Sequence, residues 1–205
     1  MMEKLNIPYP VIVEGKYDKI RLGSVIEGQI LTTDGFGLFN HAEKLALFRR
    51  LSEKSRIILL TDSDGAGKLI RSKITSAIPK ERLIQLYIPQ IKGKEKRKTV
   101  GSAEGTLGVE GMENDLLYRL LEPYALSKDT PDAARAAYFE NPLSKTDFFV
   151  DGLSGGENSA EKRDAFAKSL GLPTGMTANA LLAATKLLLT YDQYLEKVGR
   201  GASNL

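Results

Sequence analysis

The sequence predicts an α/β protein, in which a mostly parallel sheet flanked by helices is followed by a small α-helical C-terminal domain. In the first 122 residues, short apolar runs alternate with amphipathic segments, which is the pattern of strand–helix–strand units. Three prolines then fall within residues 123–143, and helical periodicity resumes beyond them. We therefore expect a first domain over residues 1–122, a connector over 123–143 and a helical domain over 144–205.

The apolar runs place the expected strands. Residues 57–61 form the clearest one, and further strands are expected at 10–13, 29–33, 84–88 and, as a last short strand, Leu107–Glu110. Helical segments are predicted at residues 17–25, 42–52, from 68 onward, 115–121 and 177–194. Another begins near residue 159 and is ended by Gly171 and Pro173. Strands that alternate with helices form parallel sheets, and ligands bind beyond the carboxyl ends of such strands.

Composition excludes several classes of function. The formal net charge of +3 is too small to indicate nucleic-acid binding by itself. The absence of cysteine excludes disulfides, thiol nucleophiles and cysteine-bound zinc, and the single His41 cannot form a histidine cluster. No stretch has the length or the apolar character of a membrane span or a signal peptide. We expect a cytoplasmic protein that does not engage a membrane.

Acidic residues follow the predicted strands. Glu14 comes directly after the first strand, Asp34-Gly35 after the second, and Asp62 and Asp64 after the clearest one. Neighbouring parallel strands lie about 4.8 Å apart, so these acids can meet around one small cation. Carboxylate ligands without histidine or cysteine suit Mg²⁺, with Mn²⁺ as the alternative, and such ions catalyse phosphoryl chemistry. Ordinary turn chemistry is the competing interpretation.

Basic residues stand close to these acids in the sequence. Lys68 and Arg71 occupy the first turns of the helix after Asp64, and a basic run covers Lys92–Lys98. A solvated face is the plain interpretation, and a grip on a nucleic-acid backbone is the functional one. Aromatic residues do not interleave with the basic run, which favours a duplex over a single strand. The predicted substrate-binding residues are Lys16, Asp34, Gly35, Lys68, Arg71, Lys92, Lys94, Lys96, Arg97 and Lys98.

Two segments resemble the motifs of toprim domains. Val11–Asp18 looks like the first motif, a strand that ends in Glu-Gly with an aspartate shortly after it. Leu59–Gly67 looks like the Asp-x-Asp motif. The resemblance implies a toprim-type fold, a Glu14 that serves in acid–base catalysis or metal binding, and an Asp62–Asp64 pair that holds magnesium.

The whole chain is similar to the ribonuclease M-five family, the 5S ribosomal RNA maturases. The similarity lies in four segments: Lys68–Arg71, Gly108–Glu110, Leu153–Gly156 and Ser159–Leu172. It implies endonucleolytic cleavage of double-stranded precursor 5S RNA with magnesium, aided by a ribosomal protein. It also implies that Glu110 joins Glu14, Asp62 and Asp64 around the metal, the last three being the catalytic residues.

Other interpretations stay open. Gly111 stands where that family tends to have histidine, so a divergent toprim protein that acts on DNA is one alternative. A non-catalytic RNA-binding or ribosome-assembly factor is another. Haloacid-dehalogenase-like phosphatases also use a strand followed by Asp-x-Asp-Gly, with the first aspartate as nucleophile. Their motif starts the fold, whereas here a strand that ends in Glu14 precedes Asp62.

Overall fold

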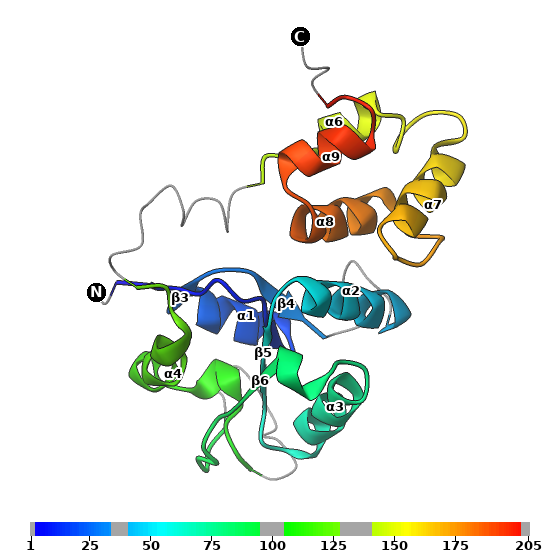
Figure 1. Ribbon diagram of the computed structural model, residues 1–205. Helices are drawn as coiled ribbons and strands as arrows, with labels where there is room; N and C mark the ends of the chain where they lie inside the picture. The colour runs from blue at the N-terminus through cyan, green and yellow to red at the C-terminus, as the bar shows by residue number, and fades with distance from the viewer. Residues whose placement is uncertain (1–2, 34–40, 95–104, 128–140, 202–205) are drawn as a thin grey trace. The chain divides into compact units, whose positions relative to one another are not determined.

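The computed structural model describes most of the chain, namely residues 3–33, 41–94, 105–127 and 141–201 (Figure 1). The chain divides into two compact units. The first is made of Met1–Asp34 and Ser52–Phe139, and the second of Gly35–Leu51 and Glu140–Leu205. Sequence boundaries at 122 and 143 stay a prediction. The grouping of Gly35–Leu51 with the C-terminal helices is a feature that chain order did not indicate.

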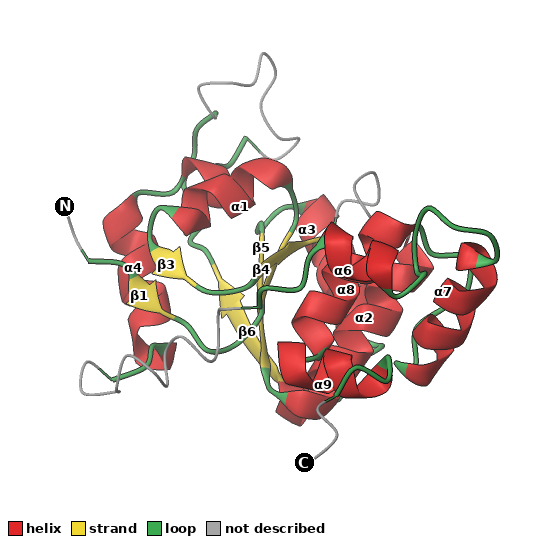
Figure 2. Ribbon diagram, turned by 90° about the horizontal axis from the view of Figure 1, so that it is seen from above, coloured by secondary structure: helices red, strands yellow, loops and turns green. Residues whose placement is uncertain are grey.

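The first unit is built on a parallel sheet with the strand order β4-β2-β5-β6. Figure 2 draws the strands of the protein in yellow and its helices in red. Its strands are β2 (Val11–Val13), β4 (Ile30–Thr32), β5 (Ile57–Thr61) and β6 (Leu83–Tyr87). All three neighbouring pairs are parallel. The predicted α/β class and parallel sheet are therefore confirmed, and the arrangement is consistent with a toprim-like fold.

Two short parallel strands lie outside this sheet, and the sequence did not predict them. They are β1 (Leu5–Asn6) and β3 (Ile26–Glu27). The prediction of a short strand over Leu107–Glu110 is wrong. A 3-10 turn, η2 (Val109–Gly111), occupies that place, because backbone N–H groups there bond to acidic side chains of the first unit instead of to a strand.

Helices pack against this sheet. They are α1 (Lys16–Gly23), α3 (Gly65–Thr75) and α4 (Asn114–Leu121), with the short turns η1 (Lys80–Arg82) and η3 (Glu122–Tyr124). Ile58 and Leu60 of β5 belong to one buried cluster with Leu22 of α1 and Leu117 of α4. Successive strand residues point to opposite faces, so the buried Leu59 serves the other side of the sheet.

The second unit is helical. It contains most of α2 (His41–Lys54) together with α6 (Lys145–Val150), α7 (Ser159–Ser169), α8 (Ala178–Leu188) and α9 (Tyr191–Lys197). Phe148, Phe166 and Tyr194 form its aromatic centre, with ring centroids 5.8 to 6.4 Å apart. The single helix expected over 177–194 is two helices, because the Thr190 side chain accepts the Gln193 N–H and starts α9 as an N-cap.

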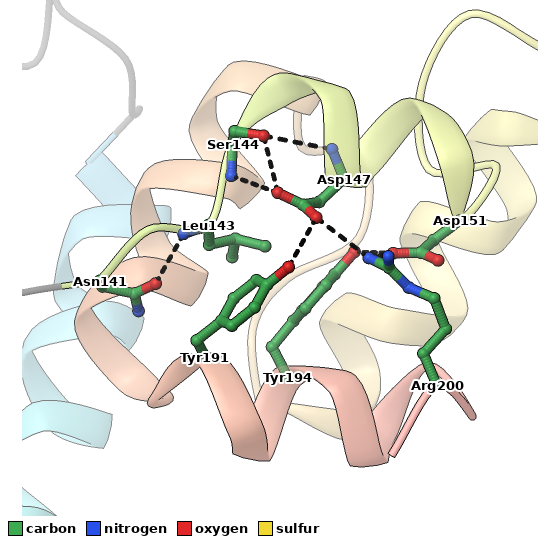
Figure 3. A network of polar contacts seen from close by, with 8 residues as sticks. All are labelled: Asn141, Leu143, Ser144, Asp147, Asp151, Tyr191, Tyr194 and Arg200. Atoms are coloured by element: carbon green, nitrogen blue, oxygen red, sulfur yellow. Dashed lines mark hydrogen bonds and ion pairs between the residues drawn. The ribbon is translucent and has the colours of Figure 1, made fainter. Parts of the chain in front are cut away.

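A polar network also fixes α9 on α6 (Figure 3). Asp147 accepts hydrogen bonds from the Tyr191 hydroxyl and from Arg200, and Asp151 accepts from the Tyr194 hydroxyl and from Arg200. Among the described residues, no helix has the length and apolar character to span a bilayer.

Candidate active site

Glu14 and Asp62 meet at the carboxyl edge of the sheet. Glu14 follows β2 and Asp62 follows β5, and these two strands are parallel neighbours. The backbone N–H of Asp62 donates a hydrogen bond of 2.7 Å to Glu14 Oε1. The two predicted catalytic acids therefore come from different strands and share one edge, as ligand sites in parallel sheets do.

Asp64 begins the next helix. Its Oδ1 accepts the N–H of Gly67 at 2.9 Å, which makes it the N-cap of α3. The side chain is half-buried, and its charge acts on Glu14. All three predicted catalytic acids thus lie within electrostatic reach of one another.

Two glycines allow the backbone to approach these acids closely. A Cβ atom on Gly67 would lie 2.2 Å from the carbonyl oxygen of Asp62 and 2.6 Å from Glu14 Oε1. A Cβ atom on Gly108 would lie 2.2 Å from Asp62 Oδ2. The Gly67 position requires glycine, because the neighbouring atom there belongs to the backbone. At Gly108, a side chain would displace the carboxylate of Asp62. Both glycines belong to motif segments of the sequence, Leu59–Gly67 and Gly108–Glu110.

The turn after Gly108 donates backbone hydrogen bonds to Asp62 and Asp18. The N–H of Val109 donates to Asp62 Oδ1 at 2.8 Å. The N–H of Glu110 donates to Asp18 Oδ1 at 3.0 Å, and the N–H of Gly15 donates to Asp18 Oδ2 at 2.9 Å. The segment that the sequence analysis singled out as Gly-Val-Glu therefore borders the acidic edge, although as a turn and not as a strand.

The acidic edge changes the protonation of its members. Burial, followed by the negative charge of Asp62, raises the pKa of Glu14 to about 7, and the Asp62 N–H opposes part of this rise. Burial and the charge of Asp62 also raise the pKa of Asp18, to about 6. Glu14 is therefore able to gain and lose a proton near neutral pH, which suits a general acid or base.

The predicted basic residues differ in their surroundings. Lys16 and Lys68 are exposed in the first turns of α1 and α3, directly after Glu14 and Asp64. Arg71 is only 8% exposed. Its Nη2 donates to the Leu86 carbonyl oxygen at 2.6 Å, and its guanidinium lies 3.9 Å from the centroid of the Tyr87 ring. The structure thus gives Arg71 an internal partner on β6, and its contact with a substrate stays a prediction.

The beginning of the basic run forms one side of an antiparallel stem. Lys92 pairs with Thr106 in an antiparallel bridge, and the Leu107 N–H donates to the Ile91 carbonyl oxygen at 2.8 Å. The stem enters Gly108 directly, so it is anchored beside Asp62. Lys94 ends the described part of the run. Lys96, Arg97 and Lys98, like Asp34 and Gly35, lie outside the described residues.

Comparison with known proteins identifies the family. No family model matches the chain. The protein named ribonuclease M5 1 from Ligilactobacillus salivarius (strain UCC118) is 30% identical over 159 residues, which cover 78% of this chain and 76% of that relative. This chain belongs to the ribonuclease M5 family. Ribonuclease M5 from Bacillus anthracis is 26% identical over 169 residues, and that from Clostridium botulinum (strain Hall) is 23% identical over 188 residues. The latter alignment covers 92% of this chain and 93% of the relative.

In this member of the ribonuclease M5 family, the described acids at the edge of the sheet are of the type that binds a divalent cation, but their side chains are not grouped around one point. Carboxylate oxygens are the ligands that Mg²⁺ and Mn²⁺ prefer. Burial, and after it the charges of neighbouring carboxylates, raises the pKa of Glu14. Within the described ranges, however, no three acidic or histidine side chains are grouped closely enough to hold a metal ion. Metal binding by Glu14, Asp62, Asp64 and Glu110 therefore stays a prediction.

The sequence did not predict the role of Asp18 in this ribonuclease M5 family member, where it holds two backbone segments of the site. It noted Asp18 as part of the first motif without giving it a task. The side chain is 7% exposed and bridges two backbone N–H groups that lie far apart in the sequence. The place of Asp18 three residues after Gly15, at the start of a helix, indicates a cap, but no local signal indicates the partner at Glu110.

Proposed function

We propose that this protein is a magnesium-dependent endoribonuclease with a toprim-type catalytic domain that hydrolyses phosphodiester bonds in double-stranded RNA. A precursor of 5S ribosomal RNA is the proposed substrate. The observation that carries the proposal is the junction of Glu14 and Asp62 at the carboxyl edge of the sheet, in a chain of the ribonuclease M5 family. The alternation of strands and helices before Asp62 further separates the chain from the phosphatase class considered above.

Glu14 is the proposed acid–base residue. A pKa of about 7 lets its carboxylate accept a proton from an attacking water at neutral pH and return it later. Its Oε1 accepts the Asp62 N–H at 2.7 Å, and we assign the proton exchange to the second oxygen of the carboxylate. Asp62 is held in turn by the Val109 N–H, and Asp64 by the Gly67 N–H.

Mg²⁺, with Mn²⁺ as the alternative, would be held by Glu14, Asp62, Asp64 and Glu110. When bound, such an ion neutralises charge on the phosphate and lowers the pKa of a water molecule. The meeting of Glu14 and Asp62 at the carboxyl ends of two neighbouring strands is the feature of the chain that supports this assignment.

Exposed cations around the acidic edge are the proposed contacts to the RNA backbone. Lys16 and Lys68 stand beside Glu14 and Asp64, and Lys92 and Lys94 lie on the stem that leads to Gly108. Phosphate contacts position a duplex without reading its sequence. Selection of the 5S precursor then needs a further determinant, for which we propose a ribosomal protein bound to that RNA. The proposed location is the cytoplasm.

A second candidate function is a non-catalytic RNA-binding or ribosome-assembly factor. The specific observation in its favour is that the described acidic side chains do not already stand in a metal-holding arrangement. A divergent enzyme that acts on DNA is the remaining alternative.

One assay separates these functions. The wild-type chain is incubated with a precursor 5S transcript and with a DNA duplex of the same sequence, in Mg²⁺ and in EDTA. We expect cleavage of the RNA duplex only, with Mg²⁺ only, and its loss in Glu14→Gln and Asp62→Asn but not in Glu81→Gln, which changes an exposed acid of η1. Cleavage of the DNA duplex instead indicates the divergent enzyme. Tight RNA binding without cleavage, equal in wild type and Glu14→Gln, indicates the non-catalytic factor.

A further inference from the structure

Helix α1 reaches across the site to the turn that carries Glu110. Asp18, from the first turn of α1, accepts the Glu110 N–H on Oδ1 at 3.0 Å. Its other oxygen accepts the Gly15 N–H at 2.9 Å, so the same carboxylate holds the residue that follows Glu14. One buried side chain thus connects the backbone beside one proposed metal ligand to the backbone of another.

Arg21 holds the same turn from its other side. Its Nε donates to the Glu110 carbonyl oxygen at 3.0 Å, and its Nη1 donates to Asn114 Oδ1 at 3.1 Å. The N–H and the C=O of Glu110 are therefore both bonded to side chains that stand three residues apart on α1, where they share one face. The neighbouring Val109 N–H is bonded to Asp62, so the turn is fixed on both sides.

The chemistry of Asp18 indicates more than helix capping. A carboxylate is costly to bury unless its oxygens accept hydrogen bonds, and that of Asp18 is 7% exposed. A cap alone needs one acceptor, which an amide or a hydroxyl supplies without that cost. The Gly15 and Glu110 N–H groups bond to two different oxygens of one short side chain, and only a carboxylate has two acceptor oxygens.

We propose that Asp18 and Arg21 are positioning residues that set the place of the Glu110 side chain relative to Asp62. This inference rests on the proposed function, in which Glu110 and Asp62 hold the cation. Groups that orient metal ligands from behind typically change metal affinity by 10- to 100-fold when they are lost. We therefore expect variants of Asp18 and Arg21 to bind metal more weakly and to keep most of the RNA cleavage rate at saturating metal.

The test compares Asp18→Asn and Arg21→Lys with the exposed matched controls Asp115→Asn and Arg119→Lys on α4. Asparagine keeps one acceptor and loses the second, and lysine cannot serve the Glu110 carbonyl oxygen and Asn114 in the same way. Mn²⁺ binding to the unloaded protein is measured by electron paramagnetic resonance, and amide hydrogen exchange is measured at Glu110. We expect Mn²⁺ affinity to fall about 10- to 100-fold in both variants, with faster exchange at Glu110 and no change in the controls.

The outcomes distinguish the inference from the function on which it rests. If the wild type binds Mn²⁺ and cleaves RNA, and both variants bind Mn²⁺ as tightly as it does, the positioning role is refuted while the function stands. If the wild type neither binds Mn²⁺ nor cleaves RNA, the function is refuted and the positioning role falls with it. If Asp18→Asn does not fold, as circular dichroism would reveal, the half-buried Arg21 decides through Arg21→Lys and the double-mutant combination with Asn114→Ala.

Discussion

The main-chain N–H of Asp62 donates its hydrogen bond to the side chain of Glu14, so the ends of β2 and β5 are joined by one proposed catalytic residue acting on the backbone of the other. A carboxylate in that position is held near three further acids, Asp62, Asp64 and Asp18. Its protonation state is therefore linked to the stability of the fold.

The first prediction concerns pH. The pKa of Glu14 is raised in the folded chain from 4.5 to about 7, so folding favours the protonated form. The contribution of Glu14 is fully present below pH 4.5 and is lost as the pH rises through 7. In EDTA, the free energy of unfolding should fall over this interval, as measured by urea unfolding. Glu14→Gln keeps an acceptor for the Asp62 N–H and should flatten the dependence. An equally steep profile in Glu14→Gln would contradict the assignment.

The second prediction concerns Gly67. An added Cβ would meet the Asp62 carbonyl oxygen at 2.2 Å, so Gly67→Ala must move the acidic edge. We expect a loss of about 1–3 kcal/mol in the free energy of unfolding, together with a loss of RNA cleavage. Gly23→Ala is the matched control, because nothing lies within 4 Å of its added Cβ and alanine favours a helix. Equal stability of the two variants in thermal unfolding would contradict the close approach.

The third prediction separates two basic residues of α3. Lys68→Ala should weaken RNA binding and lower the salt dependence of log K by about 1, because one phosphate contact is removed. Arg71→Ala should instead lower stability, since it removes a buried guanidinium from Leu86 and Tyr87. Lys73→Ala, at the far end of the helix, is the control. Filter binding at several salt concentrations and thermal unfolding supply the measurements, and a salt slope unchanged by Lys68→Ala argues against its phosphate contact.

The fourth prediction uses a buried hydroxyl group. Thr61 Oγ1 has no hydrogen-bond partner among the described residues, although the side chain is fully buried. Thr61→Val keeps the shape and removes the unsatisfied group, so the free energy of unfolding should stay equal or rise by about 1 kcal/mol. Thr185→Val is the opposite case, because its equally buried Oγ1 donates to the Leu181 carbonyl oxygen at 2.8 Å. A clear loss of stability in Thr61→Val would mean that the hydroxyl is satisfied in solution.

The fifth prediction concerns the network of Figure 3. Tyr194 is fully buried and its hydroxyl donates to Asp151, and both burial and this bond raise the pKa of the phenol. Tyr194→Phe should cost about 1.5–3 kcal/mol, the range for a hydrogen bond to a charged group. Tyr191→Phe removes a bond of 3.0 Å to the less buried Asp147 and should cost less. Denaturant unfolding of the two variants gives the comparison, and the reverse order would contradict this account.

The sequence was most informative where one physical cause dominated. The run of five apolar residues in β5 allowed few alternatives to a buried strand, and the parallel order followed from the helices between the strands. Pairing of the two-residue strands β1 and β3 depends on contacts that no local pattern encodes. The segment Leu107–Glu110 looked extended because it is apolar, yet its N–H groups bond to Asp62 and Asp18 and fold it into a turn.

Side-chain direction was the least predictable part of the site. Arg71 stands in the first turns of α3, where a cation is normally solvated, but Leu86 and Tyr87 offer it a carbonyl oxygen and a ring face. Asp18 was visible as a motif residue, whereas its bond to Glu110 spans 92 positions. Such pairings arise from the folded arrangement and not from spacing along the chain.

The grouping of Gly35–Leu51 with the C-terminal helices has a practical meaning for anyone who dissects this chain. Arg50 Nε donates to the Leu170 carbonyl oxygen at 2.8 Å. The helical unit therefore includes a segment that lies between β4 and β5 in the sequence. A fragment that begins at residue 141 would lack that segment. A fragment that ends before residue 141 would leave α2 without the C-terminal helices that it packs with. The compact units of this protein are not continuous in sequence. A chimera that exchanges the C-terminal helices between relatives therefore has to exchange α2 as well.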